Sequence, residues 1–363
     1  MNGLRKLPWL ALLLASLALA VGTAACGGDD GDEGNGGAAA ETGEGGGEQE
    51  AIKVGLVSDT GGLDDRGFNE FSINGLERAE EELSVDGRVY ESRSADDYLP
   101  NLTAAAEDGS NLVVAVGFLL GHSVSEAAAE YTEVNFAGVD NFYGEEPDCG
   151  EDPDPPCVRP NTLGLIYPSE EPGYLAGIVA AMMTKTGTVS TVGGEKIPPV
   201  DNWIAGFQQA IKDTKPSVKM LNQYSQDFVD PAKCKEIALD QIRQGSDIVF
   251  QVAGKCGLGA IDAACEEGKM AIGVDADQSA AGDCVITSAL KPLETSVFDV
   301  IQRAQEGRFE GGQNLVFSVQ DYPEADLLAP FADAVPQNVR DAVAAAQEKL
   351  ISGEIDPPAE LGK

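Results

Sequence analysis

The chain has 363 residues, of which 61 are acidic and 24 are basic, so its formal net charge is −37. Nucleic-acid binding requires basic patches that contact phosphates, and so acidic a chain is not expected to have a nucleic-acid partner. The chain has one histidine, His122, and no CxxC pair, which argues against a zinc site. We therefore expect neither a metal nor a cofactor.

The N-terminal segment has the layout of a secretory signal. Arg5 and Lys6 precede an apolar run over residues 7–21, and small residues stand directly before Cys26. A cysteine in this place resembles the lipobox of bacterial lipoproteins, although Thr23 stands where that box usually has Leu, Val or Ile. We predict a lipoprotein signal peptide over residues 1–25 and a lipid on Cys26, which would hold the chain on the extracytoplasmic face of the cell membrane. The alternative is an uncleaved anchor, but the run is short of the about 20 apolar residues that a span needs.

Residues 26–50 are predicted to form a disordered tether. Between residues 27 and 50 the sequence is rich in glycine and has eight acidic side chains and no basic one. Such a segment buries too little apolar surface to offset the entropy lost on ordering.

From residue 51 onward, strand-like and helix-like runs alternate. The strands are nearly continuous in apolar residues, which favours parallel sheets covered on both faces and predicts a doubly wound α/β fold. The predicted strands are Ile52–Val57, Leu112–Gly117, Asn135–Val139, Thr188–Val192, Ile248–Val252, Met270–Val274 and Val285–Ser288. The predicted helices are Asn69–Leu83, Pro100–Glu107, Val124–Tyr131, Pro172–Thr184, Val200–Lys212, Pro231–Gln244, Gly259–Glu267, Pro292–Gly307 and Asn338–Ile351.

The order of these elements predicts two doubly wound parallel-sheet lobes joined by hinge crossovers. We expect the first lobe to comprise residues 51–163 and 289–314, and the second residues 164–288 and 315–350, with a tail over 351–363. Several crossovers between two lobes are typical of periplasmic binding proteins, in which a ligand closes the cleft.

Six cysteines follow Cys26, and an even number in an exported chain favours disulfides. Cys149 and Cys157 flank an insertion over residues 150–156, where a bridge would close a small loop. Six cysteines allow 15 connectivities, so the pairing stays open. The pairs expected for the other four, which lie on neighbouring elements, are Cys234–Cys256 and Cys265–Cys284.

Candidate ligand-binding side chains follow the strands. In an open α/β sheet the ligand crevice forms at the carboxyl ends of the strands. The turn after the first strand brings acceptors, an amide and an aromatic ring to that edge, which suits a polar ring or a sugar better than a lipid. The residues at strand ends are Asp59, Asp64, Asp65, Phe68, Asn69, Asp140, Phe250, Gln251 and Asp275. Helix capping is the alternative role of the aspartates, and core packing that of the phenylalanines.

Several blocks resemble the basic membrane protein family, the nucleoside-binding lipoproteins of ABC importers. Their order and spacing carry the resemblance. The blocks are Val57–Asn69, Asp97–Leu102, Phe136–Asp140, Gly173–Gly177, Met182–Gly187, Val192–Val200, Phe228–Lys233, Val249–Gly254 and Ala271–Gln278.

The resemblance implies a class I periplasmic-binding-protein-like fold that holds a purine nucleoside between two aromatic rings. It implies an ABC permease and its ATPase as partners, and we expect a monomer that is not an enzyme. By motif, Phe68 and Phe250 would sandwich the base, and Asn69 and Asp140 would bind its edge. The ribose would be held by Gly254, Asp275 and Lys291, with Asp277 as a close rival to Asp275, while Asp59 would line the wall of the first lobe.

The sequence departs from the family beside the expected sugar site. Family members usually have Ala-Gly-Gly-Thr-Gly where this chain has Ala253-Gly-Lys-Cys-Gly257, and Cys234 stands at a position that is commonly Gly. The joint change to cysteine fits a bridge between Cys234 and Cys256. An inward-pointing Lys255 would favour an anionic or more polar ligand. Trp203, where Phe is common, is expected either at the mouth of the cleft or in the core of the second lobe.

Two other functions remain as alternatives. A receptor for a sugar or a signalling molecule would use the same fold and the same polar edge. A calcium-dependent nucleoside hydrolase is a weaker alternative, because Ser58 and Thr60 stand where its Asp-rich motif needs aspartates, and calcium takes about six to eight oxygen ligands.

Overall fold

The computed structural model describes residues 51–144 and 157–362. The predicted signal peptide, Cys26, the tether and Cys149 lie outside these residues. The chain from residue 49 onward forms one compact unit, and the four hydrophobic cores found in the described residues all lie within it.

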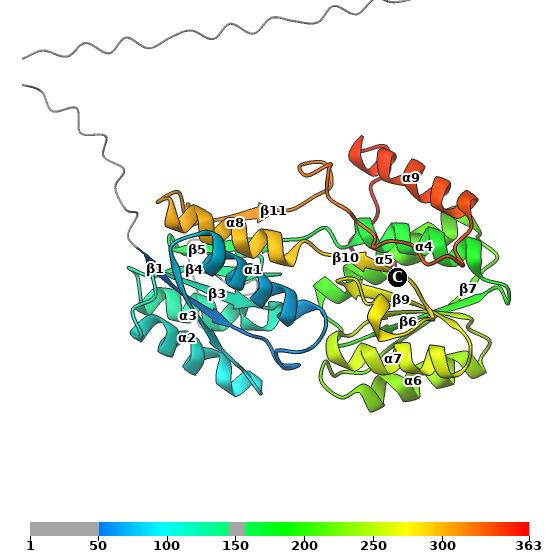
Figure 1. The fold of residues 1–363 in the computed structure, drawn as a ribbon, viewed down its shortest axis with the longest axis horizontal. Helices are drawn as coiled ribbons and strands as arrows, with labels where there is room; N and C mark the ends of the chain where they lie inside the picture. Colours follow the sequence, from blue (N-terminus) through cyan, green and yellow to red (C-terminus); the bar gives the residue numbers. More distant parts are fainter. Residues whose placement is uncertain (1–50, 145–156, 363) are drawn as a thin grey trace, which may run out of the picture. The chain divides into compact units, whose positions relative to one another are not determined.

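Lobe 1 is built on a six-stranded parallel sheet in the order β11-β5-β4-β3-β1-β2 (Figure 1). Its strands are β1 Ile52–Val57, β2 Val85–Tyr90, β3 Leu112–Val116, β4 Asn135–Val139, β5 Thr162–Ile166 and β11 Gln313–Val316. Neighbouring residues along a strand enter different cores, as Leu56 and Val57 do, because side chains alternate between the two faces. Helices α1 Phe68–Glu82 and α8 Leu293–Gln305 cover one face, and α2 Tyr98–Glu107 and α3 Gly121–Glu130 cover the other.

Lobe 2 repeats this plan on a five-stranded parallel sheet in the order β10-β9-β8-β6-β7. Its strands are β6 Thr188–Gly193, β7 Lys219–Tyr224, β8 Ile248–Val252, β9 Met270–Asp275 and β10 Val285–Leu290. Helices α4 Glu170–Met183, α5 Pro198–Thr214 and α9 Gln337–Ile351 pack on one face, and α6 Pro231–Arg243 and α7 Gly254–Glu266 pack on the other. The two sheets confirm the predicted fold class.

The chain passes between the lobes three times, after β5, after β10 and after β11 (Figure 1). β5 pairs with β4, and β11 pairs with β5, so both lie in the sheet of lobe 1. The first and third crossings are joined by a stack of rings, since Tyr167 and Phe317 lie 5.5 Å apart at 18° and Phe317 stacks on Tyr322 at 5.3 Å. The segments that connect the lobes therefore pack on each other through the rings of Tyr167, Phe317 and Tyr322.

Two disulfides lie in lobe 2 and both hold α7. Cys234–Cys256 joins α6 to the first turn of α7, with Cα atoms 5.5 Å apart, and Cys265–Cys284 joins the last turn of α7 to the segment before β10, with Cα atoms 5.1 Å apart. These two pairings were predicted and are confirmed. Cys157 is described, but Cys149, its expected partner, lies outside the described residues.

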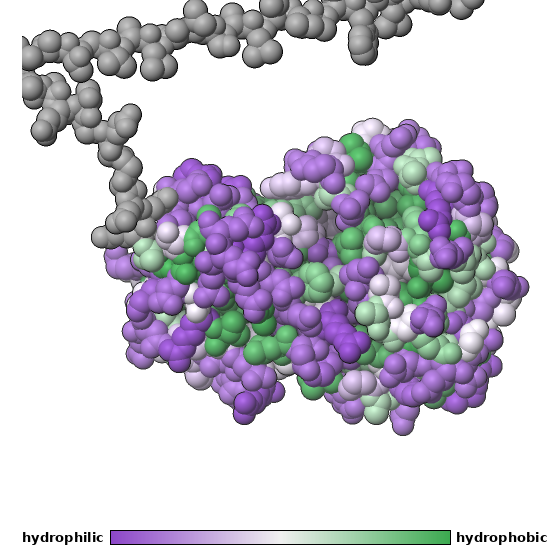
Figure 2. All heavy atoms as spheres, in the orientation of Figure 1, coloured by the Kyte–Doolittle hydropathy of each residue, from purple (hydrophilic) through white to green (hydrophobic). Residues whose placement is uncertain are grey.

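The face of the folded body shown in Figure 2 is largely hydrophilic, in keeping with the acidic composition. A search of the described residues finds no helix with the length and apolar character needed to cross a membrane.

Candidate functional site

A cleft lies between the carboxyl ends of the strands of the two lobes. Its empty volume is about 600 Å³, a figure that includes space open to solvent. Lobe 1 contributes the β1–α1 turn, Phe118 shortly after β3 and Asp140 directly after β4. Lobe 2 contributes the start of α5, the β7–α6 loop, the ends of β8 and β9 and the start of α7. The lining residues are Asp59, Thr60, Asp65, Phe68, Asn69, Phe118, Asp140, Ile197, Pro199, Val200, Trp203, Phe228, Val252, Gly254, Lys255, Asp275 and Lys291.

The β1–α1 turn is fixed by its own polar side chains. The buried Asp65 carboxylate accepts hydrogen bonds from the backbone N–H groups of Gly67, Asn69 and Glu70 at 2.9–3.1 Å, which satisfies donors at the start of α1. The Asn69 amide donates to the carbonyls of Thr60 and Gly62 and accepts from the Asp59 N–H. Because these bonds occupy the amide, Asn69 shapes the turn that presents Phe68, in addition to lining the cleft.

Asp59 forms part of the lobe 1 wall, where it is 8% exposed. Its carboxylate accepts hydrogen bonds from the Tyr98 hydroxyl and the Thr60 N–H. Burial raises the pKa of Asp59 to about 6, although these hydrogen bonds oppose the rise. A Cβ at Gly117 would lie 2.2 Å from its carboxylate, so the chain needs glycine there.

The floor of the cleft holds a cluster of buried charges. Asp140 directly follows β4 and Asp275 is the last residue of β9, and both have left-handed backbone conformations, with φ of 59° and 66°. The Lys291 ammonium, which follows β10, lies 2.6 Å from the Asp140 carboxylate, and the two side chains are 2% and 8% exposed. Burial raises the pKa of Asp275 to about 7, with Lys291 lowering it and Asp140 and Asp65 raising it. No described residue donates a hydrogen bond to the Asp275 carboxylate, so it faces the cleft as an open acceptor.

Aromatic rings stand on both sides of this floor. The Lys291 ammonium lies 5.2 Å from the centre of the Phe68 ring, 5.2 Å from that of Tyr167 and 5.7 Å from that of Trp203. On lobe 2 the Phe228 ring lies against two glycines, since a Cβ at Gly194 would lie 2.2 Å from it and one at Gly254 would lie 3.7 Å from it. Phe68 and Phe228 thus line the cleft from opposite lobes.

Two expected site residues lie outside the cleft lining. Phe250 is fully buried in the core of lobe 2, where its ring lies 5.2 Å from Phe207 and 6.4 Å from Trp203. Successive side chains of β8 point to opposite faces, and Phe250 points to the face covered by α4 and α5, so its expected place against the ligand was wrong. Asp277 is exposed and its carboxylate accepts from the Ser279 N–H, a turn role that removes it as a rival to Asp275.

The remaining expected ligand residues line the cleft: Asp59, Phe68, Asn69, Asp140, Gly254, Asp275 and Lys291. Phe228 was missed as the lobe 2 ring, although it opens the block Phe228–Lys233 and stands just before Asp230, whose side chain caps α6. That position after a strand was the available signal, but β7 was not predicted. Trp203, for which cleft and core were both expected, is 2% exposed and lines the cleft while packing in the core of lobe 2.

Two contacts join the two lobes. The Lys255 ammonium lies 2.7 Å from the exposed Asp64 carboxylate, and the Gln278 amide donates to the Arg66 carbonyl at 3.2 Å. Since Asp64 neutralises Lys255, the structure gives no support to the expectation that Lys255 would favour an anionic ligand.

The two aspartates that the hydrolase alternative needs as metal ligands have other partners. Asp64 forms the ion pair with Lys255, and Asp65 caps the start of α1. The described residues contain no group of three His, Cys, Asp or Glu that could hold a metal. Nothing in the described site supports the hydrolase alternative.

Comparison with known proteins finds similarity to ABC transporter substrate-binding proteins. Residues 52–323 match the family model described as "Bmp: ABC transporter substrate-binding protein PnrA-like". The chain is 30% identical over 329 residues to the "ABC transporter nucleoside-binding protein BmpA" of Lactococcus lactis, covering 85% of this chain and 89% of that protein. It is 29% identical over 321 residues to "Basic membrane protein A1" of Borrelia garinii, covering 87% and 91%.

Solved structures agree with the fold. An ABC transporter solute-binding protein from Aeropyrum pernix is 25% identical, with a TM-score of 0.72 and coverage of 84% of this chain and 92% of that one. One from Conexibacter woesei is 24% identical, with a TM-score of 0.65 and coverage of 85% and 99%.

Proposed function

The chain belongs to the Bmp family of PnrA-like ABC transporter substrate-binding proteins, and we propose that the substrate it binds is a purine nucleoside. As a substrate-binding protein of this family, it serves a permease and an ATPase that import a small molecule. The nucleoside would lie in the cleft between the two lobes.

The observation that carries this proposal is the division of the cleft into aromatic walls and a charged floor. A nucleoside has a flat, apolar base and a sugar with several hydroxyl groups, so it needs both. Phe68 and Phe228 offer ring faces from opposite lobes, while the floor offers the open Asp275 carboxylate and the Lys291–Asp140 pair. The naming of the Lactococcus relative as a nucleoside-binding protein supports the same ligand class.

In the proposed complex the base lies between Phe68 and Phe228, where each aromatic contact is worth roughly 0.5–1.5 kcal/mol beyond area burial. Asp275 accepts hydrogen bonds from the ribose hydroxyls, and Asp140 with Lys291 binds a polar edge. These polar groups supply most of the discrimination, because leaving one of them unpaired on binding costs about 1–3 kcal/mol.

Closure of the lobes completes this site, because neither lobe carries both rings. Lys291 follows the last strand of lobe 2 on the second crossing and pairs with Asp140 of lobe 1, so it lies where the lobes turn against each other. The Lys255–Asp64 pair then lies over the mouth. Hinge closure around a ligand is a recurring motion of two-lobed binding proteins.

We also propose the arrangement at the membrane that the sequence predicts. The chain is a monomer anchored by lipid at Cys26, and residues 26–50 tether the folded body to the extracytoplasmic face of the membrane. Labelling of growing cells with a radioactive fatty acid tests the anchor, since a Cys26→Ser variant is expected to lose the label.

The ligand is tested by thermal unfolding of residues 51–363, produced with their disulfides and freed of bound ligand by unfolding and refolding. A ligand at about 100 times its dissociation constant adds roughly 2.7 kcal/mol to the free energy of unfolding. We expect adenosine, guanosine or inosine to raise the melting temperature, and free ribose, amino acids and myo-inositol to leave it unchanged. A response to a sugar or to another small molecule, with none to any nucleoside, would replace the proposed ligand with the alternative receptor function.

A further inference from the structure

The lobe 2 wall of the cleft rests on the Cys234–Cys256 disulfide. The bond between Cys234 and Cys256 joins α6 to the first turn of α7. Both cysteines are fully buried. Cys256 stands next to Lys255 and two residues after Gly254, and these two residues line the cleft.

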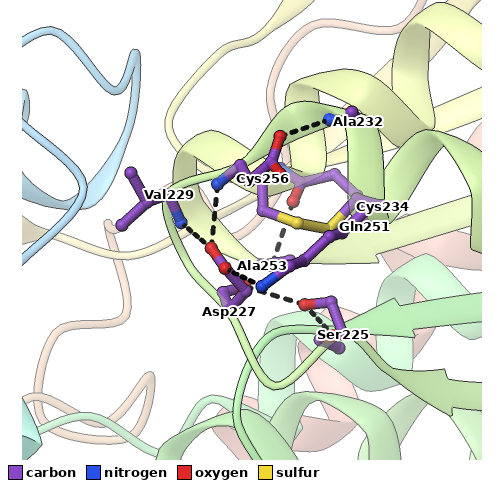
Figure 3. The surroundings of a disulfide bond; sticks show 11 residues. Ser225, Asp227, Val229, Ala232, Cys234, Gln251, Ala253 and Cys256 are labelled. Carbon is purple, nitrogen blue, oxygen red and sulfur yellow. Dashed lines mark hydrogen bonds and ion pairs between the residues drawn. A yellow bond between two sulfur atoms is a disulfide. The ribbon is translucent and has the colours of Figure 1, made fainter.

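The same bond braces the loop that carries Phe228. The Cys256 N–H donates to the Phe228 carbonyl at 3.0 Å, which ties the bridged turn of α7 to the backbone of the cleft phenylalanine. Cys234 lies in α6, which begins three residues after Phe228, at Pro231. The backbone of Phe228 is therefore part of a closed ring: the chain runs from Phe228 to Cys234, the disulfide leads to Cys256, and the Cys256 N–H bonds back to the Phe228 carbonyl. Figure 3 shows the loop, the two helices and the disulfide together.

The loop is also held by hydrogen bonds of its own side chains and by the ion pair between Asp227 and Lys233. The Asp227 carboxylate accepts from the Val229 N–H at 2.6 Å and the Asp230 N–H at 2.8 Å, and the Ser225 hydroxyl donates to the Asp227 carbonyl at 2.7 Å (Figure 3). These three bonds join residues of the loop to one another. Val229 itself is 48% exposed. Ser225 and Gln226 also donate backbone hydrogen bonds to Gly193 and Gly194, the Ser225 hydroxyl donates to the Gly193 carbonyl, and the Phe228 ring packs on Gly194 and Gly254. The bridged helix pair adds the hydrogen bond from Cys256 to the Phe228 backbone.

We propose that the Cys234–Cys256 disulfide is a positioning element of the binding site: it holds the Phe228 ring and the Lys255 ammonium in the places where they meet a ligand. The inference takes its ligand from the proposed function. It adds that the affinity for this ligand depends on a disulfide whose two cysteines do not line the cleft. The second bridge, Cys265–Cys284, stands at the other end of α7, and neither of its cysteines lines the cleft.

This second bridge is a matched control. The two bridges span 22 and 19 residues, so loop closure predicts similar losses of stability when each is removed. The bridge variant is Cys234→Ala/Cys256→Ala and the control variant is Cys265→Ala/Cys284→Ala. A packing variant, Cys234→Ala/Cys256→Val, returns apolar volume to the buried site without the bond and serves where the first variant does not fold.

Affinity is read from the fluorescence of Trp203, the one tryptophan in residues 51–363, titrated separately with inosine, guanosine and adenosine at a temperature where each variant is folded. We expect the bridge and packing variants to bind at least tenfold more weakly than the wild type, and the control variant to bind within twofold of it. An affinity loss that follows melting temperature across all three variants would show that the bridge acts on stability alone and would overturn the proposal.

A second measurement needs no ligand. In hydrogen-exchange mass spectrometry of the ligand-free protein, we expect the segment Ser225–Lys233 to exchange at least tenfold faster in the bridge and packing variants and unchanged in the control. Unchanged exchange in the bridge variant would overturn the positioning role whatever the ligand is. A wild type whose Trp203 signal responds to no nucleoside, beside the expected exchange pattern, would reject the proposed function and leave the positioning role standing.

Discussion

At the scale of single residues, the two phenylalanines of lobe 2 have different tasks. Phe228 lines the cleft against Gly194 and Gly254, whereas Phe250 packs against Phe207 in the core. The ring type is the same, so only position decides whether it serves affinity or stability.

Replacing each of them is expected to separate these tasks. Phe228→Ala should weaken nucleoside binding at least tenfold with a small change in melting temperature, because a half-buried ring on a loop adds little to the core. Phe250→Ala should lower the free energy of unfolding by about 3–5 kcal/mol and leave the dissociation constant of the folded fraction nearly unchanged. Calorimetric titration and urea unfolding of both variants test this, and the opposite assignment would return Phe250 to the site.

The raised pKa of the Asp275 carboxyl predicts how the stability of the ligand-free protein depends on pH. Burial raises its pKa from 3.8 to about 7, so the folded protein holds a proton that the unfolded chain has lost between these values. Stability falls with rising pH wherever the folded state binds more protons, so Asp275 is expected to lower the stability of the ligand-free protein as pH rises from about 4 to about 7.

Nucleoside binding should have the opposite dependence, because ribose hydroxyls donate best to the ionised carboxylate. Affinity is expected to fall below pH 7 by up to about tenfold per pH unit, and Asp275→Asn should be weak and flat over the same range. Titrations between pH 5 and 8 at constant ionic strength measure both. The idea fails if the variant keeps the pH profile of the wild type.

At the scale of elements, most central strands were predictable, whereas the edge strands β2, β7 and β11 were not, and β10 is the edge strand that was predicted. β3, β4 and β8 are covered on both faces and read as unbroken apolar runs, which fixes their positions. β2 and β7 are edge strands with exposed positions and contain Asp86, Arg88, Asn222 and Gln223, so their pattern resembles that of a loop. The missed β7 also explains why the loop after it, with Phe228, was not placed at the cleft.

Prediction of the site was limited by side-chain direction. The sequence places Phe250 at a strand end but does not state which face of the sheet its side chain joins, because that depends on register with neighbouring strands. In contrast, Asp140 and Asp275 are the first polar residues at the ends of buried apolar runs, and both line the cleft. The Lys255–Asp64 pair could not be foreseen, because its partners come from different lobes.

The Lys255–Asp64 ion pair is expected to slow ligand release only slightly. Asp64 is 83% exposed in its side chain, so the ion pair is screened by water and is worth less than about 1 kcal/mol. Lys255→Ala and Asp64→Asn should each weaken binding by no more than about fivefold, mainly through faster release. Each should also remove the salt dependence of release that we expect of the wild type between low and high sodium chloride. Stopped-flow measurement of the release rate checks this, and a salt dependence retained in both variants would contradict it.

At the scale of the whole molecule, the buried Lys291–Asp140 pair links the second crossing to lobe 1. Lys291→Met should destabilise the ligand-free protein by about 3–5 kcal/mol, because it leaves Asp140 as a buried charge without a partner. The double variant Asp140→Asn/Lys291→Met is expected to recover most of this loss. Urea unfolding of the wild type, both single variants and the double variant gives the coupling energy, and additive effects would show that the pair is not coupled.

The charge balance of the cleft has a consequence for metabolism. Four aspartates line it against two lysines, and Lys255 is already neutralised by Asp64. A nucleotide would bring the negative charges of its phosphate to this carboxylate-rich surface, where like charges repel. If the ligand is the nucleoside proposed above, the receptor discriminates against nucleotides, and material released from degraded nucleic acid reaches it only after a phosphate-ester hydrolysis outside the cell. With that ligand, we expect uptake of such material to depend on an extracellular phosphomonoesterase that acts before the importer.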